Sequence, residues 1–230
     1  MEKKNVVKKV FKVIGVIVLI AFVLFMVNTI RKLIIIKEIQ RTASQYTSST
    51  NYHVKSIASG MNGEDRITTI NCYYKEGNKL TTLEMSEKGE KTYKLSIYDN
   101  GEKKDVFTET KEQKMAEIDA EDAMNFIMPI YDYFEGGSNM QLICIAIASK
   151  VENIEYKGKK CYRVGDFVSS DTLVDINSNN SEVYIEKDTG LVIRTHFGSS
   201  ISEREYEFNN VQDEVFIEPD LKEYKVIKNS

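Results

Sequence analysis

The sequence has little of what most enzymes use for chemistry. It contains only two histidines, His53 and His196, and no tryptophan. It has no HExxH, GxSxG, P-loop or GxGxxG motif, so the usual signatures of zinc peptidases, serine hydrolases and nucleotide-binding enzymes are missing. No acidic residue stands at helical or strand spacing from either histidine. We therefore predict no catalytic residues and a protein that is not an enzyme.

Cysteine is also scarce. Cys72, Cys144 and Cys161 each lie in apolar or β-like surroundings, and none belongs to a CxxC pair. Zinc sites and thioredoxin-type redox sites therefore lack support. The sequence is compatible with free buried thiols or with a bridge between Cys72 and Cys161.

Two groups of acidic residues invite a metal-binding interpretation, and both have a simpler one. The first group falls in the first turn of an expected helix, where acids stabilise the helix dipole: Asp119, Glu121 and Asp122. The second group has a calcium-like spacing but lacks the glycine and the closing glutamate of an EF-hand loop: Asp171, Asp175, Asn177 and Asn179. We predict no metal site and no cofactor.

Charge is missing altogether from residues 13–30, an 18-residue apolar run interrupted only by Asn28 and Thr29. This length is just enough for a helix to cross the hydrocarbon core of a membrane. Five lysines precede the run, which favours a cytoplasmic N-terminus. No small-residue cleavage site follows it, so an uncleaved anchor is favoured over a signal peptide. The prediction is a basic cytoplasmic segment at 1–12, a transmembrane helix at 13–31, a juxtamembrane helix with a polar break at 32–51, and an extracytoplasmic domain at 52–230.

The charge balance changes sharply after the anchor. Residues 1–41 hold nine basic and two acidic residues, whereas the remainder holds 22 basic and 33 acidic residues, a net charge of −11. Such a domain is repelled by nucleic acid, so nucleic-acid binding is excluded. About 190 residues remain after the anchor, which suits one domain with its own core.

Period-two alternation of apolar and polar residues predicts β-structure over most of that domain. The clearest case is VYIEKDTGLVIRT at 183–195, two alternating runs joined by a glycine-containing turn, which is typical of a β-hairpin. Asn100-Gly101 is a second strong hairpin signal. Besides that hairpin, we expect strands at 52–58, 66–74, 79–85, 91–98, 103–109, 152–156, 160–164 and 203–208.

Helices are expected at three places. One leaves the membrane, ends near Tyr46 and carries five residues on one face: Ile35, Ile36, Ile39, Ala43 and Tyr46. A second begins at Asp119, is interrupted by Pro129 and ends at Gly136-Gly137. A third covers 140–148, because Ser138 and Gln141 fit a capping box. The fold class is therefore α+β, a transmembrane helix followed by an antiparallel sheet of about ten strands packed on helices.

The order of elements resembles a known superfamily. The strand-turn units YYKEGNKL and EYKGKKCYRV, the VYIEKDTGLVIRT hairpin, and a tail with Phe208-Asn209-Asn210 and Pro219-Asp220 are similar to LolA-like and LppX-like extracytoplasmic lipoprotein carriers, including membrane-anchored versions in Gram-positive bacteria. The resemblance covers residues 37–226. It implies an antiparallel half-barrel wrapped over helices, with an apolar cavity between them that holds acyl chains.

By position, the resemblance places six residues at that cavity. They come from the second helix and from the hairpin: Phe126, Ile130, Phe134, Ile185, Ile193 and Phe197. The same side chains would equally fill a packed core. The family's carriers are soluble, whereas this chain carries an apparent tether, so shuttling between membranes is not expected.

The sequence thus favours a non-catalytic, single-pass protein of the cell membrane that holds a lipid or lipoprotein acyl chain outside the cytoplasm. The alternative is a sensor or regulatory domain of the same fold that binds a protein partner at the cell envelope.

Overall fold

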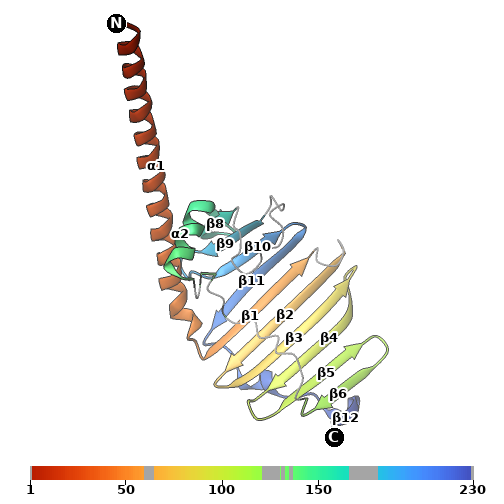
Figure 1. Cartoon of the computed structure of the whole chain (residues 1–230). Coiled ribbons are helices and arrows are strands. Elements are labelled where there is room, and N and C mark those ends of the chain that lie inside the picture. Colours follow the sequence, from red (N-terminus) through yellow and green to blue (C-terminus); the bar gives the residue numbers. More distant parts are fainter. Residues whose placement is uncertain are drawn as a thin grey trace.

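The computed structural model describes residues 2–59, 65–120, 130, 133–134, 137–165 and 181–228. A single long helix, α1 (Glu2–Thr47), projects from one end of a curved sheet (Figure 1). Its apolar segment stands clear of the domain, because Val13, Leu19 and Leu24 are each more than half exposed. This helix is long and apolar enough to cross a membrane, and only 6% of its most apolar 18-residue window is buried.

The sheet has twelve strands in one continuous layer, ordered β12-β6-β5-β4-β3-β2-β1-β11-β10-β9-β8-β7. All neighbouring pairs are antiparallel except β12 and β6, which are parallel. The strands are β1 Asn51–Ser59, β2 Arg66–Lys75, β3 Asn78–Glu87, β4 Glu90–Asp99, β5 Lys104–Thr110, β6 Lys114–Ile118, β7 Lys150–Tyr156, β8 Lys159–Gly165, β9 Ser181–Glu186, β10 Val192–Phe197, β11 Ser200–Phe208 and β12 Lys225–Lys228.

The α+β class and the antiparallel sheet are confirmed, but the expected strand count of about ten is too low. The two extra strands are the short β6 and β12. Neither has a strong local signal: β6 reads KMAEI, which also suits a helix, and the four residues of β12 gain their partner only through long-range parallel pairing. The sheet is also open, and the described helices cover only one part of it.

The C-terminal part of α1 is built into the domain core. Ile36, Ile39 and Ala43 are at most 2% exposed, and they pack against β8, β9, β10 and β1. The predicted helical face is therefore confirmed, and the helix ends at Thr47, next to the expected Tyr46. The core of the domain thus begins inside the helix that carries the apolar segment.

Helix α2 (Asn139–Ala148) begins as expected. Ser138 accepts a hydrogen bond from Gln141 N, and the Gln141 side chain accepts one from Ser138 N, which completes the predicted capping box. Most of the other predicted helix, including Phe126 and Pro129, lies outside the described residues. Asp119, its expected start, has a left-handed backbone with a φ of 55°.

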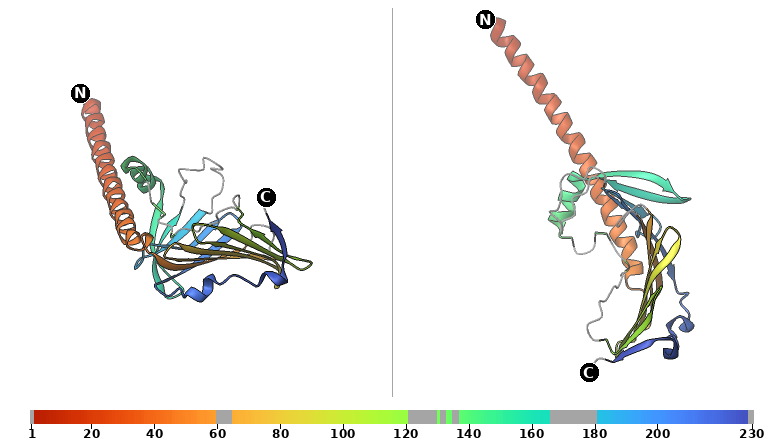
Figure 2. Two further views of the ribbon diagram at one scale, coloured as in Figure 1. Left: turned by 90° about the horizontal axis from the view of Figure 1, so that it is seen from below. Right: turned by 90° about the vertical axis from the view of Figure 1, so that its right-hand side faces the viewer.

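Helices α1 and α2 lie on one side of the sheet, and the C-terminal segment crosses the other side (Figure 2). This segment contains two short 3-10 helices, η1 (Asp213–Phe216) and η2 (Leu221–Glu223). Behind it, Phe107 of β5, Ala116 of β6 and Tyr224 form a small core. We call the side of the helices the inner face and the side of the C-terminal segment the outer face.

Candidate functional site: the inner face of the sheet

The structure describes five of the six predicted cavity residues, and these five lie in different surroundings. Phe134 and Ile185 are packed together in the core beneath α1 and α2, at 3% and 0% exposure. Ile130 belongs to the neighbouring cluster, where it packs with Ala43 of α1 and Val54 of β1. These three residues serve to hold α1 on the sheet.

Two further predicted residues, Ile193 and Phe197, lie elsewhere. Ile193 sits at a β-bulge of β10 and lines a small pocket of about 210 Å³ together with Ile57 and Tyr156. The bulge breaks the alternation on which the prediction relied, since Val192 and Ile193 are both buried. Phe197, at the end of β10, is 47% exposed, and Phe126 lies outside the described residues.

The glycine of the VYIEKDTGLVIRT hairpin has a clear structural role. Gly190 has a φ of 70°, and its Cα faces the backbone of α1 so closely that a Cβ would lie 2.6 Å from the Ile39 carbonyl oxygen. Only glycine combines that backbone conformation with that approach. The hairpin therefore fixes the anchor helix on the sheet.

A larger apolar surface lies on the inner face of β2–β6, and the sequence reasoning missed it. Strand pairing places side chains in rows that run across the sheet. One row starts beside Ser56 of β1 and contains Ile70, Leu83, Leu95, Thr108 and Met115. The next contains Thr68, Met85, Tyr93 and Thr110. We call these two sets the inner-face rows; all of their side chains are partly exposed.

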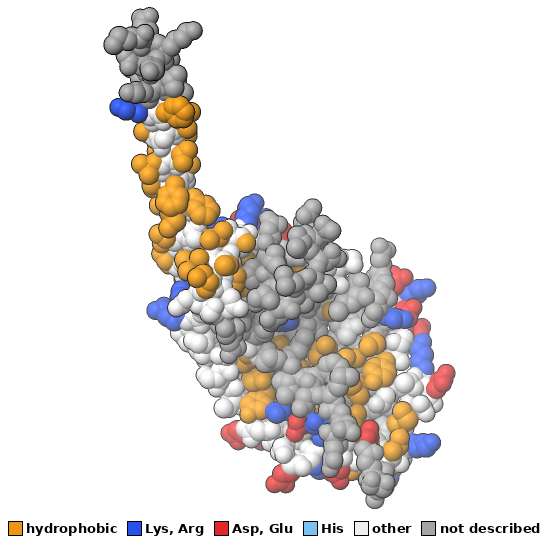
Figure 3. Space-filling model, in the orientation of Figure 1, with side chains coloured by type: hydrophobic (Ala, Val, Ile, Leu, Met, Phe, Trp, Pro, Cys, Tyr) orange, Lys and Arg blue, Asp and Glu red, His pale blue; other side chains and the backbone are white. Residues whose placement is uncertain are grey.

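The opposite side of the same strands is different in kind. The outer row behind the inner-face rows carries Thr69, Glu84, Lys94, Glu109 and Lys114. Two ion pairs connect neighbouring strands there, with Lys91 and Glu84 separated by 2.7 Å and Lys94 and Glu109 by 4.0 Å. Along this row the sheet is thus polar on its outer face, whereas the small core of Phe107, Ala116 and Tyr224 lies under the C-terminal segment. Figure 3 shows apolar side chains on the inner face beside the helices.

The described helices do not cover the inner-face rows. In the part of the chain that the structure describes, the core clusters containing α1 and α2 reach β1 and β7–β11 but no residue of β2–β6. The row nearest to α1 is nevertheless deeply buried, since Cys72 and Ile97 are 5% and 6% exposed. Burial therefore decreases from this row toward the inner-face rows.

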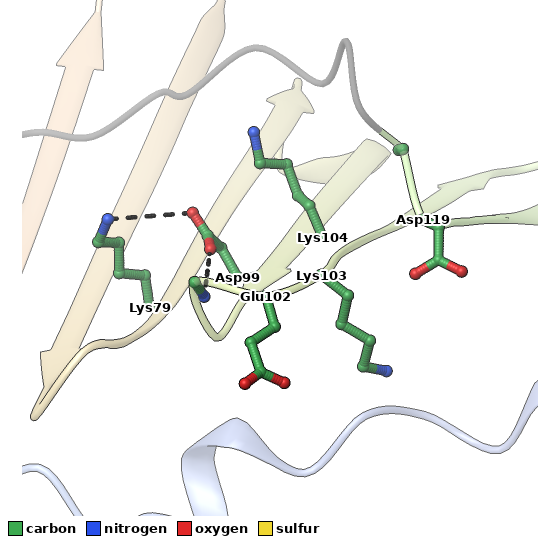
Figure 4. A pocket seen from close by; sticks show the side chains of 8 residues that line it. Lys79, Asp99, Glu102, Lys103, Lys104 and Asp119 are labelled. Carbon is green, nitrogen blue, oxygen red and sulfur yellow. Dashed lines mark hydrogen bonds and ion pairs between the residues drawn. The ribbon is translucent and has the colours of Figure 1, made fainter.

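A polar pocket of about 550 Å³ lies at the turn between β4 and β5 (Figure 4). Its charges balance, because it is lined by three lysines and three acids: Lys79, Lys103, Lys104, Asp99, Glu102 and Asp119. Several of these groups already have structural partners. Asp99 pairs with Lys79 at 3.9 Å and accepts a hydrogen bond from Gly101 N, while Lys103 contacts Asp105 at 2.6 Å.

Asp105 and Lys103 form the most buried ion pair of the described residues. Burial alone would raise the pKa of Asp105, but hydrogen bonds from Lys103 and from the Asp119 N–H lower that pKa below its ordinary value. The same contact, together with one from Glu218, raises the pKa of Lys103. This network joins the β4–β5 turn to the C-terminal segment, so its role is structural.

Among the described residues, the two histidines and the other possible metal ligands form no reactive cluster. His53 stacks on Tyr73 and lies 3.2 Å from Glu207, an acidic partner that only strand pairing could reveal. Among the described residues, no group of three His, Cys, Asp or Glu side chains is placed to hold a metal ion. None of the three cysteines forms a disulfide bond; Cys72 and Cys161 are buried, and Cys144 is exposed on α2.

Comparison with known proteins adds no family. No protein-family profile matches the chain, and no curated protein matches it significantly.

Proposed function

We propose that the protein is a membrane-anchored, non-catalytic binding protein that holds a lipid or lipoprotein acyl chain against the inner-face rows. The observation that carries this proposal is the contrast between the two sides of β2–β6. Ile70, Leu83 and Leu95 stand side by side and partly exposed, whereas the residues behind them are charged or polar. An acyl chain gains about 0.8 kcal/mol for each CH₂ group that it removes from water, so an apolar surface binds it without reactive groups.

The anchor supports the same proposal. The apolar segment of α1 is exposed along its length, as a helix in contact with lipid would be, and five lysines precede it. The orientation that follows places the N-terminus in the cytoplasm and the sheet outside it. Because α1 is continuous into the core, the inner face stays close to the membrane from which an acyl chain would come.

The absence of tryptophan allows a direct test in the full chain, reconstituted in phospholipid nanodiscs. A single tryptophan is introduced by Leu83→Trp on the inner face or by Glu84→Trp on the outer face of the same strand. Stearic acid carrying a spin label on its chain is then added as the quencher. The proposal predicts strong, saturable quenching at position 83 and weak quenching at position 84.

Because adjacent residues of β3 are at nearly the same distance from the bilayer, quenching by bilayer-dissolved fatty acid affects both reporters alike. Met115→Trp, at the far end of the first inner-face row, is a second inner-face reporter. Equal quenching on both faces, or none on either, would contradict acyl binding. An unquenched, stably folded protein would instead favour a regulatory domain that binds a protein partner at the envelope.

A further inference from the structure

Helix α2 has an unusual composition for a helix on a protein surface. Its sequence, NMQLICIAIA, contains no charged residue. Leu142 and Ala146 are buried against the core, yet the opposite side is apolar as well. There Met140, Ile143 and Ile147 are 69%, 38% and 48% exposed. Surface helices in water normally turn polar side chains outward, and apolar patches that remain exposed usually mark a contact site.

The exposed side chains share one face of α2. Met140, Ile143, Cys144 and Ile147 stand at positions i, i+3, i+4 and i+7, which share one side of a helix, and all four are exposed. We call this set the α2 outer face.

The position of α2 identifies what covers this face. Lys32 donates a hydrogen bond from Nζ to the carbonyl oxygen of Ser149, the C-cap of α2, and Lys37 contacts Asn139 at the other end, at 3.4 Å. The helix therefore lies against the turns of α1 that directly follow the apolar segment. On α1 itself, Ile30 and Ile34 remain 51% and 63% exposed at this level.

Apolar side chains thus extend from the anchor onto the domain: Figure 3 shows them on α1 and beside it, where Figure 1 places α2. Arg31, Lys37 and Lys150 are exposed nearby, at the junction between apolar and polar surface. Basic residues at this level suit the anionic headgroups of a bilayer, and an apolar helix flanked by them is typical of helices that lie in the membrane interface.

We propose that the α2 outer face inserts into the interfacial layer of the same bilayer that holds α1. The domain then has two membrane contacts, a spanning helix and a second helix beside it, which together fix how the sheet is oriented on the membrane. This inference rests on the anchoring part of the proposed function and is independent of acyl binding.

The chain itself supplies the reporter, because Cys144 is the one exposed cysteine and lies within the α2 outer face. The full chain is reconstituted into phosphatidylcholine and phosphatidylglycerol vesicles, and flotation with the vesicles confirms that α1 is inserted. The rate at which Cys144 reacts with a membrane-impermeant maleimide is then measured. Cys144→Ser gives the background from the buried Cys72 and Cys161.

The matched control is a cysteine at Ile227 in the Cys144→Ser background. Ile227 is 44% exposed, close to the 48% of Ile147, but it lies in β12 at the opposite edge of the sheet. We expect Cys144 to react several-fold more slowly than the cysteine at position 227. A fluorophore attached to Cys144 should also be quenched by spin-labelled phospholipid, and one at position 227 should not.

Placing charges on the α2 outer face should reverse both the slow reaction of Cys144 and the quenching by lipid. The double substitution Ile143→Glu and Ile147→Glu should restore fast reaction of Cys144 and remove quenching by lipid. Thermal unfolding should change little because both side chains are exposed, whereas Ile227→Glu should leave the Cys144 signals as they were. Equal reaction rates at 144 and 227 in floated vesicles would overturn the inference while leaving the anchor intact. Slow reaction without lipid quenching would also overturn it, because a protein would then cover the face.

Discussion

At the scale of single residues, the buried carboxylate of Asp105 has a stabilising role that its neighbours in the sequence do not reveal. Its side chain is 1% exposed, and its two oxygens accept hydrogen bonds from Lys103 Nζ at 2.6 Å and from Asp119 N at 3.0 Å. A buried charge is costly unless it is paired and hydrogen-bonded, and this one is both. We therefore expect the ionised Asp105 side chain, next to the β4–β5 turn, to make the stability of the protein depend on pH in the acidic range.

The substitution Asp105→Asn should lower the free energy of unfolding by about 1–3 kcal/mol at pH 7, because the ion pair with Lys103 is lost. The pKa of Asp105 is lower in the folded than in the unfolded protein. Its stabilising effect is therefore fully present above the unfolded value, about 3.9, and is lost as the pH falls through the folded value.

The two proteins should consequently converge in stability as the pH is lowered below about 4. Urea unfolding followed by circular dichroism between pH 3 and pH 8 measures this convergence. Glu90→Gln is the control, because Glu90 forms an exposed ion pair with Lys111, and we expect no measurable change. A stability difference that stays constant from pH 8 to pH 3 would contradict the assignment.

At the scale of elements, the contact between the β9–β10 turn and α1 decides how the anchor meets the domain. A Cβ at Gly190 would lie 2.6 Å from Ile39 O and 2.7 Å from Ala43 N, on the face of α1 where both residues are buried. Neither backbone atom can move aside without moving the helix. The hairpin and the helix are therefore fitted to each other.

We expect Gly190→Ala to destabilise the domain by about 2–4 kcal/mol, from the left-handed backbone and from the overlap with α1 together. Gly158→Ala separates the two causes. Gly158 also has a positive φ, 77°, but a Cβ there meets nothing within 4 Å, so only the backbone cost applies. Thermal unfolding of both variants, followed by circular dichroism, makes the comparison. Equal losses at the two glycines would rule out a tight contact with α1.

The same scale shows where sequence patterns succeed. The face of α1 with Ile36, Ile39 and Ala43 and the capping box of α2 follow from local spacing, and both are confirmed. Local spacing does not reveal a β-bulge. The bulge at Ile193 breaks the alternation, so this residue does not share the surroundings of Ile185. Local spacing also does not reveal which strands become neighbours, so β12 and the partnership of His53 with Glu207 were not predictable.

At the scale of the whole molecule, the inner-face rows illustrate the same limit. Each strand of β2–β5 shows its alternation in the sequence, as in the segment TTLEMSE of β3. The apolar surface appears only when the register sets Leu83 beside Ile70 and Leu95. The hairpin and the second predicted helix instead suggested Phe134 and Ile185 as cavity residues, and both lie in the packed core.

The contribution of α1 to the domain core also determines at which residue a soluble fragment of the protein can begin. Ile36, Ile39 and the hydrogen bond from Lys32 to Ser149 all belong to α1 and to the domain core. A fragment that starts after residue 40 would lose them, and removing two buried isoleucines leaves a large unfilled volume. The fragment to prepare is therefore 32–230, and a cooperative thermal transition must first show that it folds.

The central claim is that the sheet holds an acyl chain, and the lipid content of this fragment tests it most directly. The fragment is purified without detergent, and its bound lipid is measured by native mass spectrometry and by extraction. We expect about one acyl lipid per chain, reduced strongly by Leu83→Asn with Leu95→Asn on the inner face and unchanged by Glu84→Gln on the outer face. A stably folded fragment that contains no lipid and takes up no added fatty acid would contradict the proposal.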